Sequence, residues 1–137
     1  MLSHASKQKG NGRVIVVFGS ASKRDAGKRP LMGEAAGQFA DLTFLTAEDP
    51  RGESVAEINK QIAQGLMQKG KLEGKHYFSI EDRREAIDKA IDIAKAGDTV
   101  IISGKGHEKS MNLDGKSEIP WSDIDVVNEI LNKKRQL

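Results

Sequence analysis

The sequence has no cysteine, few aromatic residues and no long hydrophobic run. Without cysteine the chain can form neither a disulfide nor a cysteine-based zinc site, and its three histidines are scattered rather than clustered. No apolar run approaches the roughly 18 residues of a membrane-spanning helix. Residues 1–13 also contain no apolar stretch of the kind that a signal peptide needs. These absences predict a cytoplasmic protein with no membrane partner and no metal site of its own.

The chain also lacks a large net charge, because 22 basic and 20 acidic residues leave a net charge of only +2. The basic residues gather locally in "SKRDAGKRP" at 22–30, where lysines and arginines surround Asp25. Only 4% of the residues are aromatic and none interleaves with this run, so base stacking has no support. We therefore expect no nucleic-acid partner.

Strand-like and helix-like segments alternate along the chain. Patterns typical of buried strands lie at 13–18, 42–46, 76–80 and 98–103. Residues that favour the start of a helix follow these patterns, at Pro30, Ser54, Asp82 and Ser122. This alternation predicts an α/β sandwich with a mainly parallel sheet.

Local patterns also predict buried helix faces, a helix end and a hairpin. Apolar residues recur at helical spacing at Leu31, Ala35 and Phe39 and, on the inner face of the last helix, at Ile124, Val127, Ile130 and Leu131. Gly97 is expected to stop the third helix. Asp114-Gly115, within 111–119, predicts a hairpin. The polar, glycine-bearing residues 1–12 predict a disordered lead-in or linker.

Three loops leave the three best strand patterns, at 19–29, 47–53 and 104–110. They are also the segments richest in charge and glycine. In open α/β sheets, ligands bind beyond the carboxyl ends of the strands. We therefore expect these loops to meet and to form a ligand site.

The charged residues of the three loops suit a small charged ligand. Candidate contacts to an anion or a nucleotide are Lys23, Lys28, Arg29, Lys105 and His107. Arg51 could grip a carboxylate with both arms of its guanidinium, and Glu108 could receive an ammonium. The chain has no Walker A spacing, no dinucleotide fingerprint and no arrangement typical of a nucleophilic triad. The pattern thus predicts a binding domain and leaves the catalytic residues unknown.

Three motifs, "RDAGKRPLMGE", "EDPR" and "GKGHE", occur in an order and spacing that resemble the C-terminal domain of Mur ligases. The similarity covers about residues 13–131 and is to the branch of the family that adds a diamino acid to the peptidoglycan stem peptide. It implies a Rossmann-like three-layer sandwich at 13–137, with a mostly parallel sheet of about six strands. It also implies that the N-terminal and central ATPase domains are absent from this chain, which alone would be inactive.

The resemblance further implies an ATP-dependent, amide-forming ligase. Family members use ATP and Mg²⁺, held mainly by the central domain, to activate the carboxylate of UDP-N-acetylmuramoyl-L-alanyl-D-glutamate. The amine of the incoming amino acid then attacks the acyl phosphate, while the C-terminal domain binds that amino acid and closes the active site. Matched by motif position, Arg24 and Arg51 would hold a carboxylate of meso-diaminopimelate, Gly104 and Glu108 would hold the neighbouring ammonium, and Asp49 replaces a family asparagine.

The aspartate at this position conflicts with carboxylate binding. Asparagine can donate a hydrogen bond to a carboxylate, whereas ionised Asp49 can only accept one. Two like charges about 4 Å apart would cost about 4 kcal/mol at an effective dielectric constant near 20. Either Asp49 turns toward the ammonium of the substrate or the substrate differs, with meso-diaminopimelate favoured over L-lysine. The alternative is an autonomous α/β module that binds an amino acid or a nucleotide without chemistry.

Overall fold

The computed structural model describes residues 12–22 and 26–135. Residues 1–11 of the expected lead-in, and the candidate ligand contacts Lys23 and Arg24, lie outside the described residues. None of the helices in the described ranges is long and apolar enough to cross a membrane.

The centre of the fold is a parallel sheet with the strand order β3-β2-β1-β4. Its strands are β1 (Val14–Phe18), β2 (Leu42–Leu45), β3 (Tyr77–Ser79) and β4 (Thr99–Ile102). In β1 the β-branched run is buried on both faces, and Ile15 aligns with Leu42 of β2 and with Val100 of β4. This arrangement confirms the α/β class and the mainly parallel sheet.

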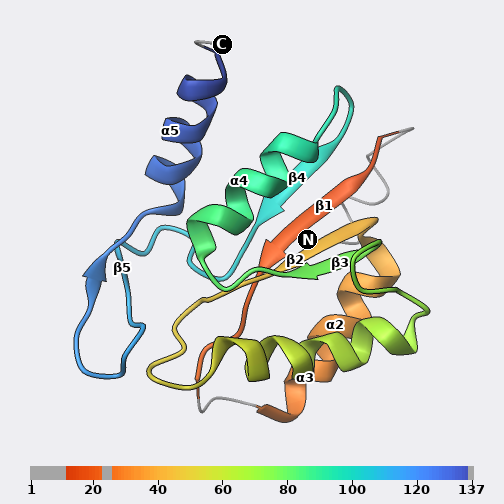
Figure 1. Ribbon diagram of the computed structural model, residues 1–137, viewed down its shortest axis with the longest axis horizontal. Helices are drawn as coiled ribbons and strands as arrows, with labels where there is room; N and C mark the ends of the chain where they lie inside the picture. The colour runs from red at the N-terminus through yellow and green to blue at the C-terminus, as the bar shows by residue number, and fades with distance from the viewer. Residues whose placement is uncertain (1–11, 23–25, 136–137) are drawn as a thin grey trace.

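The expected count of about six strands in one sheet is wrong for the described residues. The remaining strands, β5 (Ser110–Met111) and β6 (Ile119–Pro120), form a separate antiparallel pair. The chain between them turns at Gly115, whose φ is +83°, so the predicted hairpin is present. Each of these strands is two residues long, and the hairpin lies beside one end of the parallel sheet (Figure 1).

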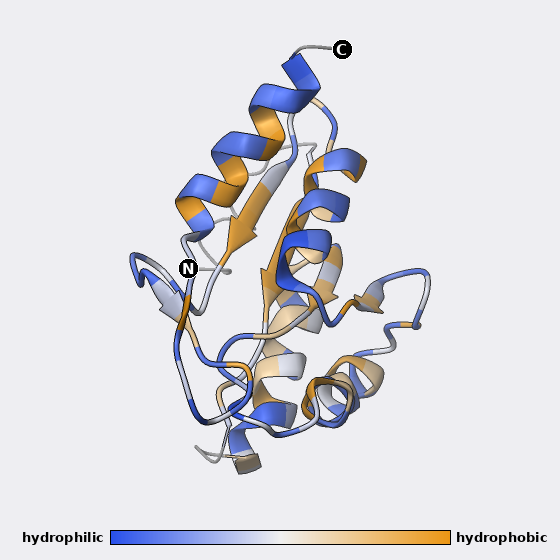
Figure 2. Cartoon of the chain, turned by 60° about the vertical axis from the view of Figure 1, so that its left-hand side comes forward, coloured by the Kyte–Doolittle hydropathy of each residue, from blue (hydrophilic) through white to orange (hydrophobic). Residues whose placement is uncertain are grey.

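Helices cover both faces of the parallel sheet (Figure 1). A 3₁₀ turn, η1 (Ala26–Lys28), leads into α2 (Arg29–Phe39), which lies with α3 (Val55–Gln68) on one face. On the other face lie α4 (Arg83–Ile93) and α5 (Asp123–Arg135). Val14 and Val16 of β1 pack toward the first pair, and Ile15 and Val17 toward the second. The helices are amphipathic and the strands almost wholly apolar (Figure 2). The sheet therefore separates two apolar cores, one on each face.

The predicted helix starts are confirmed by their capping contacts. The side chains of Ser54, Asp82 and Ser122 accept hydrogen bonds from backbone N–H groups three residues further on, at 3.2, 2.9 and 3.2 Å. Each cap satisfies a backbone donor that the first helical turn leaves unpaired. The sequence therefore determined where these helices begin.

Some buried faces and one helix end differ from the expectation. Leu31, Ala35 and Ile124 were expected to face inward but are exposed. The inner face of α2 is formed by small residues instead, because α2 lies very close to α3, and α5 turns Val126 and Ile130 toward the sheet. Helix α4 ends at Ile93, before Gly97.

The close approach of α2 and α3 depends on glycines. A methyl group at Gly65 of α3 would lie 1.9 Å from the carbonyl oxygen of Pro30, and one at Gly33 of α2 would lie 1.8 Å from that of Ile62. Both clashes are with backbone atoms, which cannot rotate away. These glycines therefore hold α2, and the loop before it, against α3.

Gly65→Ala should destabilise the domain by about 1–3 kcal/mol, the usual cost of overpacking. This is opposite to the gain of about 1 kcal/mol that alanine normally brings to a helix. Urea unfolding measures the difference. Gly27→Ala is the matched control, since a methyl group there meets no atom within 4 Å. A Gly65→Ala protein as stable as the unchanged one would contradict the close packing.

Candidate functional site

The loops that follow β1, β2 and β4 meet at the carboxyl edge of the sheet. The backbone N–H of Ser22, in the first loop, donates to the carbonyl of Asp49 in the second at 2.9 Å. Lys105 Nζ, in the third loop, donates to Asp49 Oδ1 at 2.8 Å. Asp49 therefore connects the described parts of all three loops.

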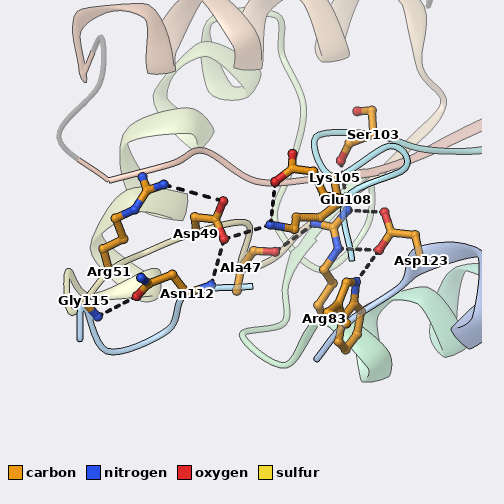
Figure 3. A network of polar contacts seen from close by, with 11 residues as sticks. Ala47, Asp49, Arg51, Arg83, Ser103, Lys105, Glu108, Asn112, Gly115 and Asp123 are labelled. Atoms are coloured by element: carbon orange, nitrogen blue, oxygen red, sulfur yellow. Dashed lines mark hydrogen bonds and ion pairs between the residues drawn. The ribbon is translucent and has the colours of Figure 1, made fainter. Parts of the chain in front are cut away.

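Lys105 is the buried centre of this loop cluster. Its side chain is 1% exposed, and Nζ contacts Glu108 Oε1 at 3.2 Å as well as Asp49 (Figure 3). Asp49 Oδ1 also accepts the backbone N–H of Asn112 at 2.9 Å, while its Oδ2 lies 4.0 Å from Arg51 Nη2. Arg51 and Glu108, the predicted partners of a carboxylate and an ammonium, thus flank one continuous polar network.

Arg51 is held in a rare backbone conformation. Its φ is +48°, the left-handed region that costs a non-glycine residue about 1–2 kcal/mol. Its N–H donates to the carbonyl of Asn112 at 3.1 Å, and the N–H of Gly52 donates to that of Leu113 at 2.8 Å. The hairpin between β5 and β6 thus braces the backbone of the second loop at Arg51, whose side chain is 39% exposed.

Glu48 and Gly104 form a second contact between these loops. A methyl group at Gly104 would lie 2.4 Å from Glu48 Oε1, and its φ of +107° is one that glycine adopts readily. Burial raises the pKa of the Glu48 carboxyl, and the Arg83 guanidinium opposes this shift without cancelling it. The motif assigned no role to Glu48, and only its place next to Asp49 hinted at one.

The pKa of Asp49 moves the other way. Burial alone would raise it, but the hydrogen bonds from Lys105 and from the Asn112 N–H outweigh burial, so the pKa lies below its ordinary value. Asp49 is therefore ionised at neutral pH. Its negative charge faces the ammonium of Lys105, and the hypothesis that it turns toward the ammonium of the substrate stays a prediction.

Beneath the loops, Arg83 joins three parts of the chain. Its guanidinium donates to both carboxylate oxygens of Asp123 at 2.9 and 2.8 Å, to the Ala47 carbonyl at 2.9 Å and to the Ser103 carbonyl at 3.1 Å (Figure 3). Trp121 Nε1 adds a hydrogen bond to Asp123 at 2.7 Å. Sequence reasoning missed this network, whose one signal was a cation in the first turn of a helix, where the helix dipole disfavours it.

The other candidate anion contacts lie in different surroundings. Arg29 is buried, and all five of its N–H groups have partners in the protein, provided by Ser20, Ala21, Glu53 and Gln61. Lys28 and His107 are exposed. Within the part of the chain that the structure describes, no group of three or more His, Asp or Glu residues could hold a metal ion.

A hollow of about 450 Å³ lies beside Arg51. It is lined by Ala26, Arg29, Arg51, Gly52 and Glu53. A larger, mostly apolar hollow of about 760 Å³ lies between β3 and the end of α4, away from the three loops. The hollow beside Arg51 therefore lies next to a partly exposed guanidinium.

A parallel α/β sheet with three charged loops at its carboxyl edge is typical of domains that bind a small charged ligand. Residues 1–106 match the family described as Mur ligase, glutamate ligase domain. The chain therefore belongs to the Mur ligase family, and the resemblance to the C-terminal domain of these ligases is confirmed.

Three individual proteins show how similar the chain is to members of this family. The UDP-N-acetylmuramyl-tripeptide synthetase of Borreliella burgdorferi is 46% identical over 94% of this chain and 25% of its own length. The UDP-N-acetylmuramoyl-L-alanyl-D-glutamate–2,6-diaminopimelate ligase of Aquifex aeolicus is 47% identical over 88% of this chain and 24% of its own. A solved structure of a ligase with that name superimposes with a TM-score of 0.84 at 34% identity, over 98% of this chain and 27% of the other. The chain thus spans about a quarter of the length of these relatives.

Proposed function

We propose that this chain is the C-terminal, amino acid-binding domain of an ATP-dependent ligase that adds meso-diaminopimelate to UDP-N-acetylmuramoyl-L-alanyl-D-glutamate. One observation carries the proposal. Arg51 and Glu108, which come from loops after different strands, flank the same pair, the partly buried Asp49 and the buried Lys105. A cation and an acid held together in this way suit the two charges of an amino acid end.

In this proposal Arg51 binds the carboxylate at the distal end of the substrate. Arg24, which lies outside the described residues, would add a second cation from the first loop. Glu108 and the backbone of Gly104 hold the ammonium of the same end. With both charges fixed, the amine at the other end of the diamino acid is aimed at the activated carboxyl group, and this positioning accelerates amide formation.

Further domains of the ligase would supply the remaining parts of the active site. We assign the UDP-sugar dipeptide, ATP and Mg²⁺ to N-terminal and central domains like those that make up the rest of the longer relatives. Mg²⁺ would neutralise phosphate charge there. The residues of this chain bind and orient the amino acid, and closing over the reaction centre excludes water. By itself the chain would bind without forming an amide.

The same geometry favours meso-diaminopimelate over L-lysine. Diaminopimelate carries an ammonium and a carboxylate at each end, so its distal end satisfies both Glu108 and Arg51. The side chain of lysine ends in an ammonium alone and would leave Arg51 without an anionic partner. A site built for a polar group rejects an analogue that lacks it more strongly than an apolar pocket rejects a missing methylene.

Assaying the complete ligase with meso-diaminopimelate and L-lysine in parallel tests this assignment. We expect kcat/KM to be at least about 100-fold higher for diaminopimelate, because lysine leaves a charged donor unpaired. The readout is amide product per ATP hydrolysed. Equal use of lysine would contradict the proposed substrate. Amino acid binding without any amide product would favour the autonomous binding module instead.

A further inference from the structure

We propose that Lys105 and Asp49 act as a positioning pair, in which the buried Lys105 cation cancels the charge of Asp49 so that Arg51 can bind the substrate carboxylate. This inference rests on the proposed function and assigns Lys105 a role different from contact with an anion. Lys105 is then a specificity-determining residue that need not touch the substrate.

The burial of Lys105 supports this role. Its side chain is 1% exposed, and its ammonium is directed at Asp49 Oδ1 at 2.8 Å rather than at solvent. Removing a lysine from water is costly unless an acid compensates it, and Asp49 is that acid. The pair joins the loop after β2 to the loop after β4, so it also sets the separation of the two recognition groups.

Charge balance explains why the lysine is needed. The negative charges of Asp49 and Glu108 both act on Glu48, and the positive charge of Lys105 opposes them there. Asp49 Oδ2 lies 4.0 Å from Arg51 Nη2, so a carboxylate bound by Arg51 would lie near an acid. Lys105 Nζ contacts the other carboxylate oxygen, Oδ1, at 2.8 Å, and its positive charge offsets the negative charge of Asp49.

Glu108 remains accessible to the substrate. It contacts Lys105 through Oε1 at 3.2 Å, three residues further along the same loop, yet its side chain is 55% exposed. An incoming ammonium can therefore approach the Glu108 carboxylate from solvent while Lys105 holds it from below. The internal cation orients this acid without closing the site.

A double-mutant cycle in the complete ligase tests the pair, using Lys105→Met, Asp49→Asn and their combination. Methionine is unbranched and only one atom shorter than lysine, and it carries no charge. We expect Lys105→Met alone to raise KM for meso-diaminopimelate about 100-fold, because the partly buried Asp49 then loses its nearest cation. In the Asp49→Asn background the same change should cost about 10-fold or less. KM for ATP should stay within about threefold in all four proteins.

Lys109→Met is the control, since it removes an exposed lysine from the same loop. It should leave both KM values and the melting temperature unchanged. A purely structural Lys105 would instead lower the melting temperature of both Lys105 variants equally and raise KM by the same factor in both backgrounds, and that result overturns the proposal. If Lys105→Met unfolds but the combined variant folds, a diaminopimelate KM within about 10-fold of the unchanged enzyme supports the pair, and a higher one overturns it.

If both Lys105 variants unfold, Lys105 is needed for the fold whatever residue 49 is, and the proposal is overturned. The unchanged ligase separates this inference from the proposed function. If it forms amides with neither diaminopimelate nor lysine, the proposed function fails and the inference fails with it. If it uses diaminopimelate but the cycle shows no coupling, only the pairing of Lys105 with Asp49 is wrong.

Discussion

Replacing Arg83 with methionine should remove about 3–5 kcal/mol from the free energy of unfolding, a large share of the roughly 5–15 kcal/mol typical of a domain. Without the guanidinium, the buried Asp123 carboxylate keeps the hydrogen bond from Trp121 Nε1 as its one side-chain donor within residues 12–22 and 26–135. The variant also removes the hydrogen bonds to the carbonyls of Ala47 and Ser103. Ala47 is the first residue of the loop at 47–53, and Ser103 directly precedes the loop at 104–110. Urea unfolding followed by circular dichroism measures the loss.

The neighbouring residue provides a matched control. Arg84 also follows the cap of α4 and pairs with an acid of α5, Glu129, but both side chains are about half exposed. Arg84→Met should therefore cost less than about 1 kcal/mol, as is usual for surface ion pairs. Combining Arg83→Met with Asp123→Leu should recover at least about 1 kcal/mol, because no buried charge is then left alone. Equal losses for Arg83→Met and Arg84→Met would contradict the role of burial.

The fold could be predicted from the sequence wherever the signal is local. The run at 13–18 indicated a strand buried on both faces, and Ser54 and Asp82 marked helix starts that the structure confirms. Strand count was harder, because a hairpin signal such as Asp114-Gly115 does not say which neighbour its strands will pair with. Here they pair with each other, outside the parallel sheet.

The site was predictable only in part, for the same reason. The rule that ligands bind at the carboxyl edge brought the three loops together correctly. The partners of Lys105 and Arg83 could not be read in this way, since the contact to Asp49 spans 56 residues and the contact to Asp123 spans 40. Sequence spacing carries no signal for such pairs, and a buried lysine looks the same in a motif as a solvent-facing one.

The residues at this edge of the sheet fall into two groups, one that supports the structure and one that is exposed to a ligand. Arg83 and Asp123 hold the ends of the strands together, and Lys105 and Asp49 hold the loops above them. Arg51 and Glu108, which are more exposed, remain available to a ligand. A substitution at Arg83 or Asp123 should thus lower the stability of the domain, and a substitution at Arg51 should change substrate use.

Arg51→Ala in the complete ligase should raise KM for meso-diaminopimelate about 100-fold, the effect expected for losing charged hydrogen bonds to a carboxylate. KM for ATP should change less than about threefold, because the proposed ATP site lies on another domain. Use of L-lysine, whose side chain has no distal carboxylate, should hardly change. The preference for diaminopimelate over lysine should therefore collapse, and steady-state kinetics with both amino acids measure it.

Two further variants separate charge from geometry at this position. Arg51→Lys keeps the charge but loses the two-armed donor, so its KM for diaminopimelate should lie between those of the unchanged enzyme and Arg51→Ala. Arg51→Asn tolerates the positive φ better than alanine does and should match Arg51→Ala in KM while melting at a higher temperature. An Arg51→Ala enzyme that keeps its preference for diaminopimelate would place the carboxylate elsewhere, and the cation that binds it would then have to come from the first loop.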